Sequence, residues 1–228
     1  MKLISILFSA AGIMFFSACS DQSGPGREVN LNEEIDSVSY SLGVNIGKNI
    51  RAQGVDELNV DALANAMSDV FNDDSLKIDE MSCNMIIQNY FENLQSSRAD
   101  KSREEGIAFL EENKMKENIK TTDSGLQYEV LQEGNGEIPQ EDDTVTVHYE
   151  GKTLDGKVFD SSIERGEPVS FPVTGVIQGW QEALQMMPVG SKWRIYVPSD
   201  LAYGERGAGR DIGPNETLIF DVELLSID

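Results

Sequence analysis

The spacing of apolar residues changes near Thr121, and this change divides the chain into two kinds of structure. Before Thr121, apolar residues recur every three or four positions, as at Val38, Leu42 and Ile46, which is the period of an amphipathic helix. After Thr121, apolar and polar residues alternate in the runs 144–149 and 218–224, which is the period of a half-buried strand. The sequence therefore predicts an all-α N-terminal part followed by an α+β part with an antiparallel sheet.

The N-terminal part is expected to contain two short helices and one longer helical segment. Gly54 separates the first two, and residues 72–74 end the second. The third begins after Asp79, a suitable N-cap, and carries apolar residues as far as Leu94. Residues 95–105 are almost wholly polar. They predict an exposed stalk helix that has no core to lie against, and the stalk extends over 95–120.

The apolar residues at 81–94 leave two interpretations open. They could face a partner chain, or they could pack only within their own small domain. Three short helices bury little surface alone, which favours a homodimer formed through 31–94. Cys83 lies in this run, where a buried inert thiol is favoured over a reactive or intermolecular one.

The first residues predict export and a lipid anchor. A basic start and an apolar run to Phe16 are too short to span a bilayer and are typical of a signal peptide over 1–18. Small residues before Cys19 resemble a bacterial lipoprotein cleavage box, although Phe16 stands where such boxes usually carry Leu. We expect a lipidated Cys19 and a flexible tether over 19–30, anchored in the cell envelope, at the outer membrane on its periplasmic side or at the cell surface. The alternative is an ordinary signal peptide in which Cys19 has no role.

Charge and cysteine content exclude several classes of function. The sequence holds 40 acidic and 18 basic residues, a net charge of −22, which repels nucleic acid, so no nucleic-acid partner is expected. With Cys19 committed to lipid, Cys83 cannot form an intrachain disulfide or a cysteine metal site. Glycines 204, 207 and 209 lack the lysine and the strand-to-helix context of a phosphate loop. No metal or cofactor is expected.

Residues 121–228 contain five short sequence motifs, called phrases below, which together hold many aromatic side chains and one acid. The turn signal at Asp155 and Gly156 predicts a hairpin, and residues 180–187 predict one short helix between Gly179 and Pro188. The phrases are VTVHYEG (145–151), GKVFD (156–160), VIQGW (176–180), LAYG (201–204) and TLIFDV (217–222). They include no plausible nucleophile or metal cluster, so they point to chemistry performed by a shaped apolar pocket.

These phrases resemble the FK506-binding-protein (FKBP) class of peptidyl-prolyl cis-trans isomerases over 121–228. The region 31–120 resembles the helical dimerisation segment of the macrophage-infectivity-potentiator group. The resemblance implies an antiparallel sheet curled around a short helix, preceded by the all-α domain and the stalk. It also implies an isomerase that acts on proline-containing unfolded or exported polypeptides and that macrolides could inhibit. The site residues that it implies are Tyr149, Phe159, Asp160, Trp180, Tyr203 and Phe220 for catalysis, and Phe171, Val176, Ile177 and Ile212 for substrate binding.

The resemblance implies a role for each part of the pocket. Trp180 would form its floor, Ile212 would close one side, and the loop 205–211 would overhang it. Asp160 would accept a hydrogen bond from Tyr149 and orient the rotating amide without carrying a proton. Val169 stands where many members carry Phe, so one aromatic wall is thinner and macrolide binding changes, with Phe171 partly filling the gap.

Alternatives remain beside the enzyme. The domain could be a chaperone or adhesion-type lipoprotein that binds extended chains, with incidental isomerisation, or a purely structural lipoprotein. Any single aromatic residue is more often core than site, and the prediction rests on the whole set in order. His148 alternates away from Tyr149 and is expected to be a surface residue.

Overall fold

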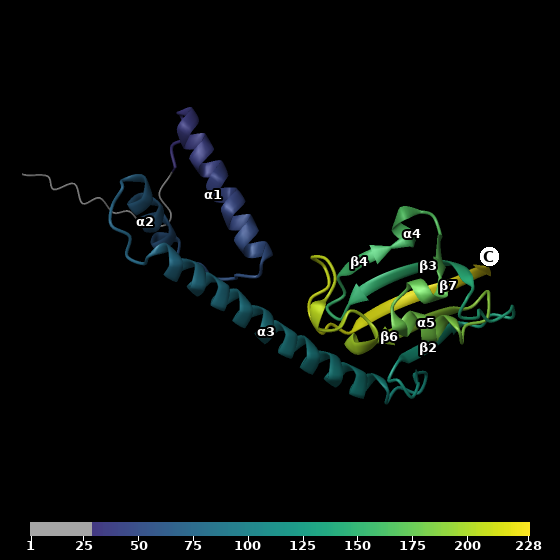
Figure 1. Ribbon diagram of the computed structural model, residues 1–228. Helices are drawn as coiled ribbons and strands as arrows, with labels where there is room; N and C mark the ends of the chain where they lie inside the picture. Colours follow the sequence, from purple (N-terminus) through teal and green to yellow (C-terminus); the bar gives the residue numbers. More distant parts are fainter. Residues whose placement is uncertain (1–28) are drawn as a thin grey trace, which may run out of the picture. The chain divides into compact units, whose positions relative to one another are not determined.

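The computed structural model describes residues 29–228, which form two compact units that meet in the sequence between Asp79 and Glu80. In the first unit, α1 spans Glu34–Ala52 and α2 spans Val60–Phe71 (Figure 1). Gly54 ends the first helix with a left-handed backbone (φ 85°). Asn59 caps the second, because its Oδ1 accepts a hydrogen bond of 2.9 Å from the N–H of Ala62. The two predicted helices and the break between them are confirmed.

Neither α1 nor α2 has a buried residue in the single chain. The large apolar side chains that should form a core stay exposed to solvent, and Phe71 is 86% exposed. The exposed apolar residues of these two helices are Ile35, Val38, Tyr40, Leu42, Val44, Val60, Met67, Val70 and Phe71. The described part of the first unit therefore leaves most of its large apolar side chains exposed, with Val55 as a buried exception.

The second unit begins with α3, one continuous helix over Glu80–Asn113. It starts where Asp79 predicted and runs unbroken through the expected boundary at residues 94 and 95. Most of residues 95–105 are exposed, as the polar sequence predicted. The expectation that this stretch has nothing to lie against is wrong, because Ala99 and Arg103 both bond to Asn215 in the loop before the last strand. Beyond the stretch, Gly106 and Asn113 of the same helix are buried. These contacts use polar groups and a glycine, which an apolar pattern does not reveal.

The sheet of the second unit is antiparallel and has the order β1-β2-β6-β7-β3-β4, with β5 paired to β3. Its strands are β1 (Lys120–Thr121), β2 (Gln127–Gln132), β3 (Thr144–Thr153), β4 (Val158–Ser161), β5 (Val169–Pro172), β6 (Lys192–Val197) and β7 (Leu218–Ile227). Every second residue is buried along β3 and along β7 as far as Leu224, which confirms the predicted alternation. The predicted hairpin also forms, with Gly156 at φ 87° and its N–H bonded to the carbonyl of Thr153 at 3.0 Å.

Helix α5 (Gln178–Leu184) packs on the face of the sheet that holds the core. Its Trp180, Ala183 and Leu184 join the same buried cluster as Val147 of β3 and Val222 of β7. The helix ends at Leu184 instead of the predicted Met187, because the chain tightens into turns ahead of Pro188. The predicted fold, an antiparallel sheet curled around a short helix after N-terminal helices, is confirmed.

Three short turns and one short helix complete the second unit. The 3-10 turns lie at Val173–Gly175, Ser199–Leu201 and Gly204–Arg206, and α4 spans Ser162–Arg165. The Ser161 side chain caps α4 by accepting a hydrogen bond of 3.1 Å from the N–H of Glu164. Within residues 29–228, no helix combines the length and the apolar character that crossing a bilayer requires.

Candidate active site

A cavity of about 420 Å³ opens between α5, β3, β4 and β5, and its surface is mostly aromatic. Its lining residues are Tyr149, Phe159, Asp160, Phe171, Gly175, Val176, Ile177, Trp180, Tyr203 and Phe220. These residues come from distant parts of the sequence, and the sheet brings them together. The phrases that sequence analysis singled out therefore meet at one place.

Trp180 lies at the centre of the aromatic side chains. It is 4% exposed, and its ring stands edge-on to Tyr149 at 5.3 Å between centroids and to Phe220 at 5.4 Å. Phe159 meets Phe220 in the same manner at 5.6 Å. Edge-to-face packing of this kind fixes each ring relative to its neighbours. The cavity floor is therefore held in place before any ligand arrives.

The position of Trp180 depends on a close approach of α5 to the sheet. The preceding residue, Gly179, lies against Val197 of β6, and a Cβ atom on Gly179 would stand 2.5 Å from Val197 Cγ1. Only glycine leaves room for this contact. Ile177 is the N-cap of α5, and its carbonyl accepts hydrogen bonds from Trp180 at 2.9 Å and Gln181 at 3.0 Å. The N–H of Ile177 precedes the helix and so does not belong to its hydrogen-bond ladder.

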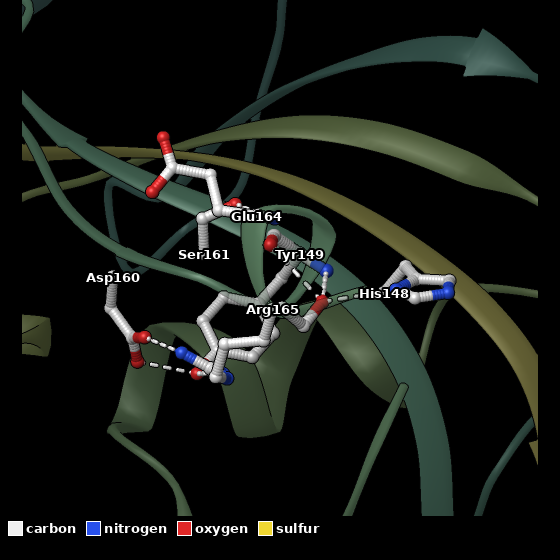
Figure 2. Close-up of polar contacts among 7 residues, drawn as sticks. His148, Tyr149, Asp160, Ser161, Glu164 and Arg165 are labelled. Atoms are coloured by element: carbon white, nitrogen blue, oxygen red, sulfur yellow. Dashed lines mark hydrogen bonds and ion pairs between the residues drawn. The ribbon is translucent and has the colours of Figure 1, made fainter. Parts of the chain in front are cut away.

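One edge of the cavity is polar, because Tyr149 and Asp160 line it there and Arg165 bonds to both of them (Figure 2). The Tyr149 hydroxyl donates a hydrogen bond to Asp160 Oδ2. Arg165 donates to Asp160 Oδ1 and, through Nη2, to the Tyr149 oxygen at 3.0 Å. Its guanidinium carbon also lies 5.6 Å from the centre of the Tyr149 ring. The three side chains thus fix one another's orientation.

These contacts shift the pKa values of the two acidic groups in opposite directions. Burial alone would raise the pKa of Asp160, but hydrogen bonds from Tyr149 and Arg165 outweigh it and hold this pKa below its usual value. Burial, together with the hydrogen bond to Asp160, raises the pKa of Tyr149 above its usual value. Near neutral pH, Asp160 is therefore ionised and Tyr149 keeps its proton.

The backbone of Tyr149 is held by Ser162, the first residue of α4. Ser162 Oγ accepts a hydrogen bond of 2.7 Å from the N–H of Tyr149 and donates one of 3.2 Å to its carbonyl. The same oxygen lies 3.1 Å from His148 Nδ1. His148 points away from the core as predicted, but it is half-buried and partnered instead of being a free surface residue.

Most of the predicted site residues line the cavity, and Ile212 does not. Ile212 is 8% exposed and belongs to the buried core cluster of this domain. The loop 205–211 does not overhang the cavity either: none of its residues lines it, and Arg210 and Asp211 face a separate cleft shared with α3. The sequence had predicted Ile212 and the loop 205–211 at the cavity. Both predictions failed because the direction of a loop depends on contacts that its composition does not encode. Cys19 lies outside the described residues.

Two contributors were missed, Arg165 and Gly175. Arg165 reaches Asp160 because the one-turn helix α4 folds the chain back, and the spacing of five residues after Asp160 was the available signal. Gly175 lines the cavity at the end of a 3-10 turn. Val169 pairs with Val147 in the sheet and is not among the lining residues. Phe171 does line the cavity, and the centroid of its ring lies 6.2 Å from that of Trp180.

The lining residues include no cysteine, serine or histidine, and their carboxylate, Asp160, already accepts hydrogen bonds from Tyr149 and Arg165. What the cavity offers is a rigid apolar floor with one ionised edge. Such a surface discriminates between forms of a bound group that differ in shape and polarity.

Comparison with known proteins gives a consistent result for both units. Residues 135–225 match the model of the family described as FKBP-type peptidyl-prolyl cis-trans isomerase. Residues 35–130 match the domain amino-terminal to FKBP-type peptidyl-prolyl isomerase. The two matches together cover α1 to α3 and nearly the whole sheet.

Individual relatives resemble the chain over most of its length. The outer membrane protein MIP of Legionella longbeachae is 40% identical, over 100% of this chain and 97% of its own. The FKBP-type 22 kDa peptidyl-prolyl cis-trans isomerase of Escherichia coli is 44% identical, over 83% of this chain and 93% of its own. The crystal structure of FkpA from Escherichia coli superposes with a TM-score of 0.70 at 33% identity, covering 87% of this chain and 99% of that one.

Proposed function

Since the chain belongs to the FKBP-type peptidyl-prolyl cis-trans isomerases, we propose that it catalyses rotation about Xaa-Pro bonds by holding the twisted amide in the cavity above Trp180. Its substrates are then proline-containing polypeptides that have been exported and are still unfolded. The observation that carries this proposal is the set of interlocked aromatic rings around Trp180 with Asp160 at its edge.

Rotation about an Xaa-Pro bond breaks the conjugation of the amide, with a barrier near 20 kcal/mol, and requires no change in any bond to hydrogen. A catalyst must therefore bind the twisted amide more tightly than either planar form. The twisted amide has less charge separation, so a dry aromatic surface favours it. Each tenfold acceleration needs about 1.4 kcal/mol of this preference.

In this proposal, the proline ring lies on Trp180 and the remaining aromatic residues form walls around it. Asp160, fixed by Tyr149 and Arg165, presents a constant negative field beside the rotating carbonyl. Tyr203, at the rim, and the N–H of Ile177 would bind the backbone of the substrate on either side of the proline. Ile212, in the buried core, supports this wall without being part of the cavity surface. Phe171 beside Trp180 replaces part of the aromatic surface that Val169 lacks, so macrolide binding is retained but altered.

The exposed apolar residues of α1 and α2 support a homodimer. A helix with no buried residue and an exposed apolar stripe requires a partner surface. The apolar residues at the start of α3, including Met81, Met85 and Ile86, are likewise exposed in the single chain. A second copy that covers both stripes would complete the helical domain over 31–94, with 95–120 as the stalk and 121–228 as the isomerase domain.

Attachment to the cell envelope follows from the N-terminal sequence and from one relative. The Legionella relative is named an outer membrane protein. In this chain, Cys19 after an apolar run supplies the means of attachment by lipid, and 19–30 the tether. The isomerase would then act on polypeptides near the membrane surface.

The test is an isomerisation assay without protease on a proline-containing peptide, read out by exchange NMR. The full chain should accelerate cis-trans exchange, and Trp180→Ala should lose most of this acceleration while keeping its folded spectrum. If the full chain prevents aggregation of an unfolded protein but leaves the exchange rate unchanged, the binding function proposed as the alternative would replace the enzymatic one.

A further inference from the structure

We propose that Arg103 of helix α3 is a positioning residue for isomerisation, because it anchors the loop that presents Tyr203 to the cavity. This inference rests on the proposed role of the cavity. It assigns a catalytic contribution to the stalk, whose polar sequence gives no indication of one. The loop concerned runs from Gly204 to Asn215 and is named here the wall loop.

The wall loop is closed at its base by a backbone hydrogen bond. The N–H of Asn215 donates to the carbonyl of Gly204 at 2.8 Å. Tyr203, which lines the cavity, directly precedes Gly204. Further along the loop, Ala208 and Ile212 form an isolated bridge through two hydrogen bonds, of 2.9 and 3.2 Å. The position of Tyr203 at the rim thus depends on how this base is held.

The side chain of Asn215 is directed at α3. Asn215 is 3% exposed and adopts a left-handed backbone (φ 56°), which asparagine tolerates better than most residues. Its Nδ2 donates to the carbonyl of Ala99 at 3.3 Å, and its Oδ1 accepts from Arg103 Nη2 at 3.4 Å. A buried amide left without these partners would be costly, so the base of the loop and the helix stabilise each other.

Arg103 reaches both sides of the base of the wall loop. The same Nη2 donates to Glu205 Oε1 at 3.1 Å, next to Gly204, as well as to Asn215. The Arg103–Glu205 ion pair is largely exposed and contributes little stability alone. Its effect is geometric, since one guanidinium group restrains the two ends of the loop together.

Close packing one turn further along α3 reinforces this anchor. A Cβ atom on Gly106 would stand 2.4 Å from Thr217 Oγ1, so the helix backbone touches the segment that joins the wall loop to β7. At the end of α3, Asn113 Nδ2 donates to Gln127 Oε1 at 2.9 Å, and Gln127 Nε2 donates to the carbonyl of Leu110 at 2.8 Å. Helix α3 is therefore docked on the sheet as well as on the loop.

The first experiment displaces α3 without weakening it. Alanine favours a helix more than glycine does, so Gly106→Ala keeps α3 helical while its methyl group collides with Thr217. In the full-length chain, we expect kcat/KM to fall about 3- to 10-fold and amide hydrogen exchange in the wall loop to accelerate. Thr217→Ala removes the colliding oxygen, so the double variant should recover to within about twofold of Thr217→Ala alone.

The second experiment removes the guanidinium. Arg103→Met keeps the apolar stem but loses both hydrogen bonds. Tyr203 is proposed to bind the substrate backbone in the ground state and the transition state alike, so KM should rise while kcat changes less than twofold. Arg103→Lys keeps a hydrogen-bond donor, so its KM should lie between those of the unaltered chain and Arg103→Met. The matched control is Lys101→Met, whose ammonium pairs with Glu105 on the same helix at 3.7 Å and which should leave both constants unchanged.

The outcomes separate this inference from the proposed function. If Trp180→Ala abolishes activity while Gly106→Ala and Arg103→Met change neither kinetics nor exchange, the cavity is the site and the positioning role is refuted. A loss in Gly106→Ala that Thr217→Ala does not reverse would also refute it. If Trp180→Ala has no effect, the proposed function fails, and the role of Arg103 fails with it.

Discussion

The hydroxyl of Tyr149 donates a hydrogen bond to the carboxylate of Asp160, and Arg165 bonds to both partners. These three hydrogen bonds join the three side chains to one another, so the acid is held in one orientation at the edge of the cavity. An acid held ionised in this way is suited to shaping the electric field around a rotating amide and poorly suited to transferring protons.

A flat pH profile is the first expected consequence. The pKa of Asp160 is lowered and that of Tyr149 is raised, so neither group changes its charge between about pH 6 and 8.5. We therefore expect kcat/KM for a proline peptide to vary less than about twofold across this range, whereas general acid-base catalysis would give a titrating limb. Histidine is the residue type whose ordinary pKa lies in or near this pH range. The control is therefore His148→Gln, which removes the one histidine of the sequence.

The stability of the isomerase domain should depend on Asp160 in a defined direction. Because the pKa of Asp160 is lower in the folded state, its ionised form stabilises the fold above the unfolded value of about 3.9, and this contribution disappears as pH falls through the folded pKa. Asp160→Asn should therefore lower Tm at pH 7 and have a smaller effect near pH 3. The side chain is 42% exposed, so the shift at pH 7 should be about 1–3 °C in calorimetry. Asp142→Asn, at an exposed position, is the control. A loss of Tm in Asp160→Asn that grows at low pH would contradict this assignment.

The homodimer should depend on residues before the sheet. Light scattering on the chain without residues 1–18 should give twice the mass of one chain. The fragment 119–228 should give the mass of one, with isomerase activity as the check that it is folded. Leu42→Asp in the longer chain places a charge in the exposed stripe of α1 and should also give a single-chain mass. A single-chain mass in every case would refute the homodimer.

The lipid anchor should be visible on the native N-terminus. Mass spectrometry of protein extracted from its own membrane should find Cys19 as the first residue, carrying acyl chains. Cys19→Ala should abolish this modification and release the protein from the membrane fraction. An unmodified N-terminus at another residue would remove the anchor from this account.

The alternation and helical periods predicted most of the fold because those strands and helices carry their apolar side chains on one face. The order of the aromatic residues likewise predicted which of them meet, since the cavity is made of the same strands and helix. The docking of α3 escaped prediction for the opposite reason. It depends on Arg103, Gly106 and Asn113, which carry no apolar pattern.

The predictions for the wall loop were also wrong. Ile212 was expected at the cavity surface, but it is 8% exposed, is bridged to Ala208 and is not among the lining residues. The following residues turn towards α3 because Asn215 finds its partners there. A single sequence gives no sign of such contacts between a loop and a helix more than a hundred positions away.

The most direct test of the account compares aromatic truncations with a change of charge. Trp180→Ala and Phe159→Ala remove parts of the apolar surface, whereas Asp160→Asn keeps its shape and removes only the negative charge. Measured as kcat/KM on one proline peptide, with folding verified for each variant, both truncations should lower activity more than Asp160→Asn does. Abolished activity in Asp160→Asn together with unchanged activity in both truncations would contradict catalysis by the aromatic cavity.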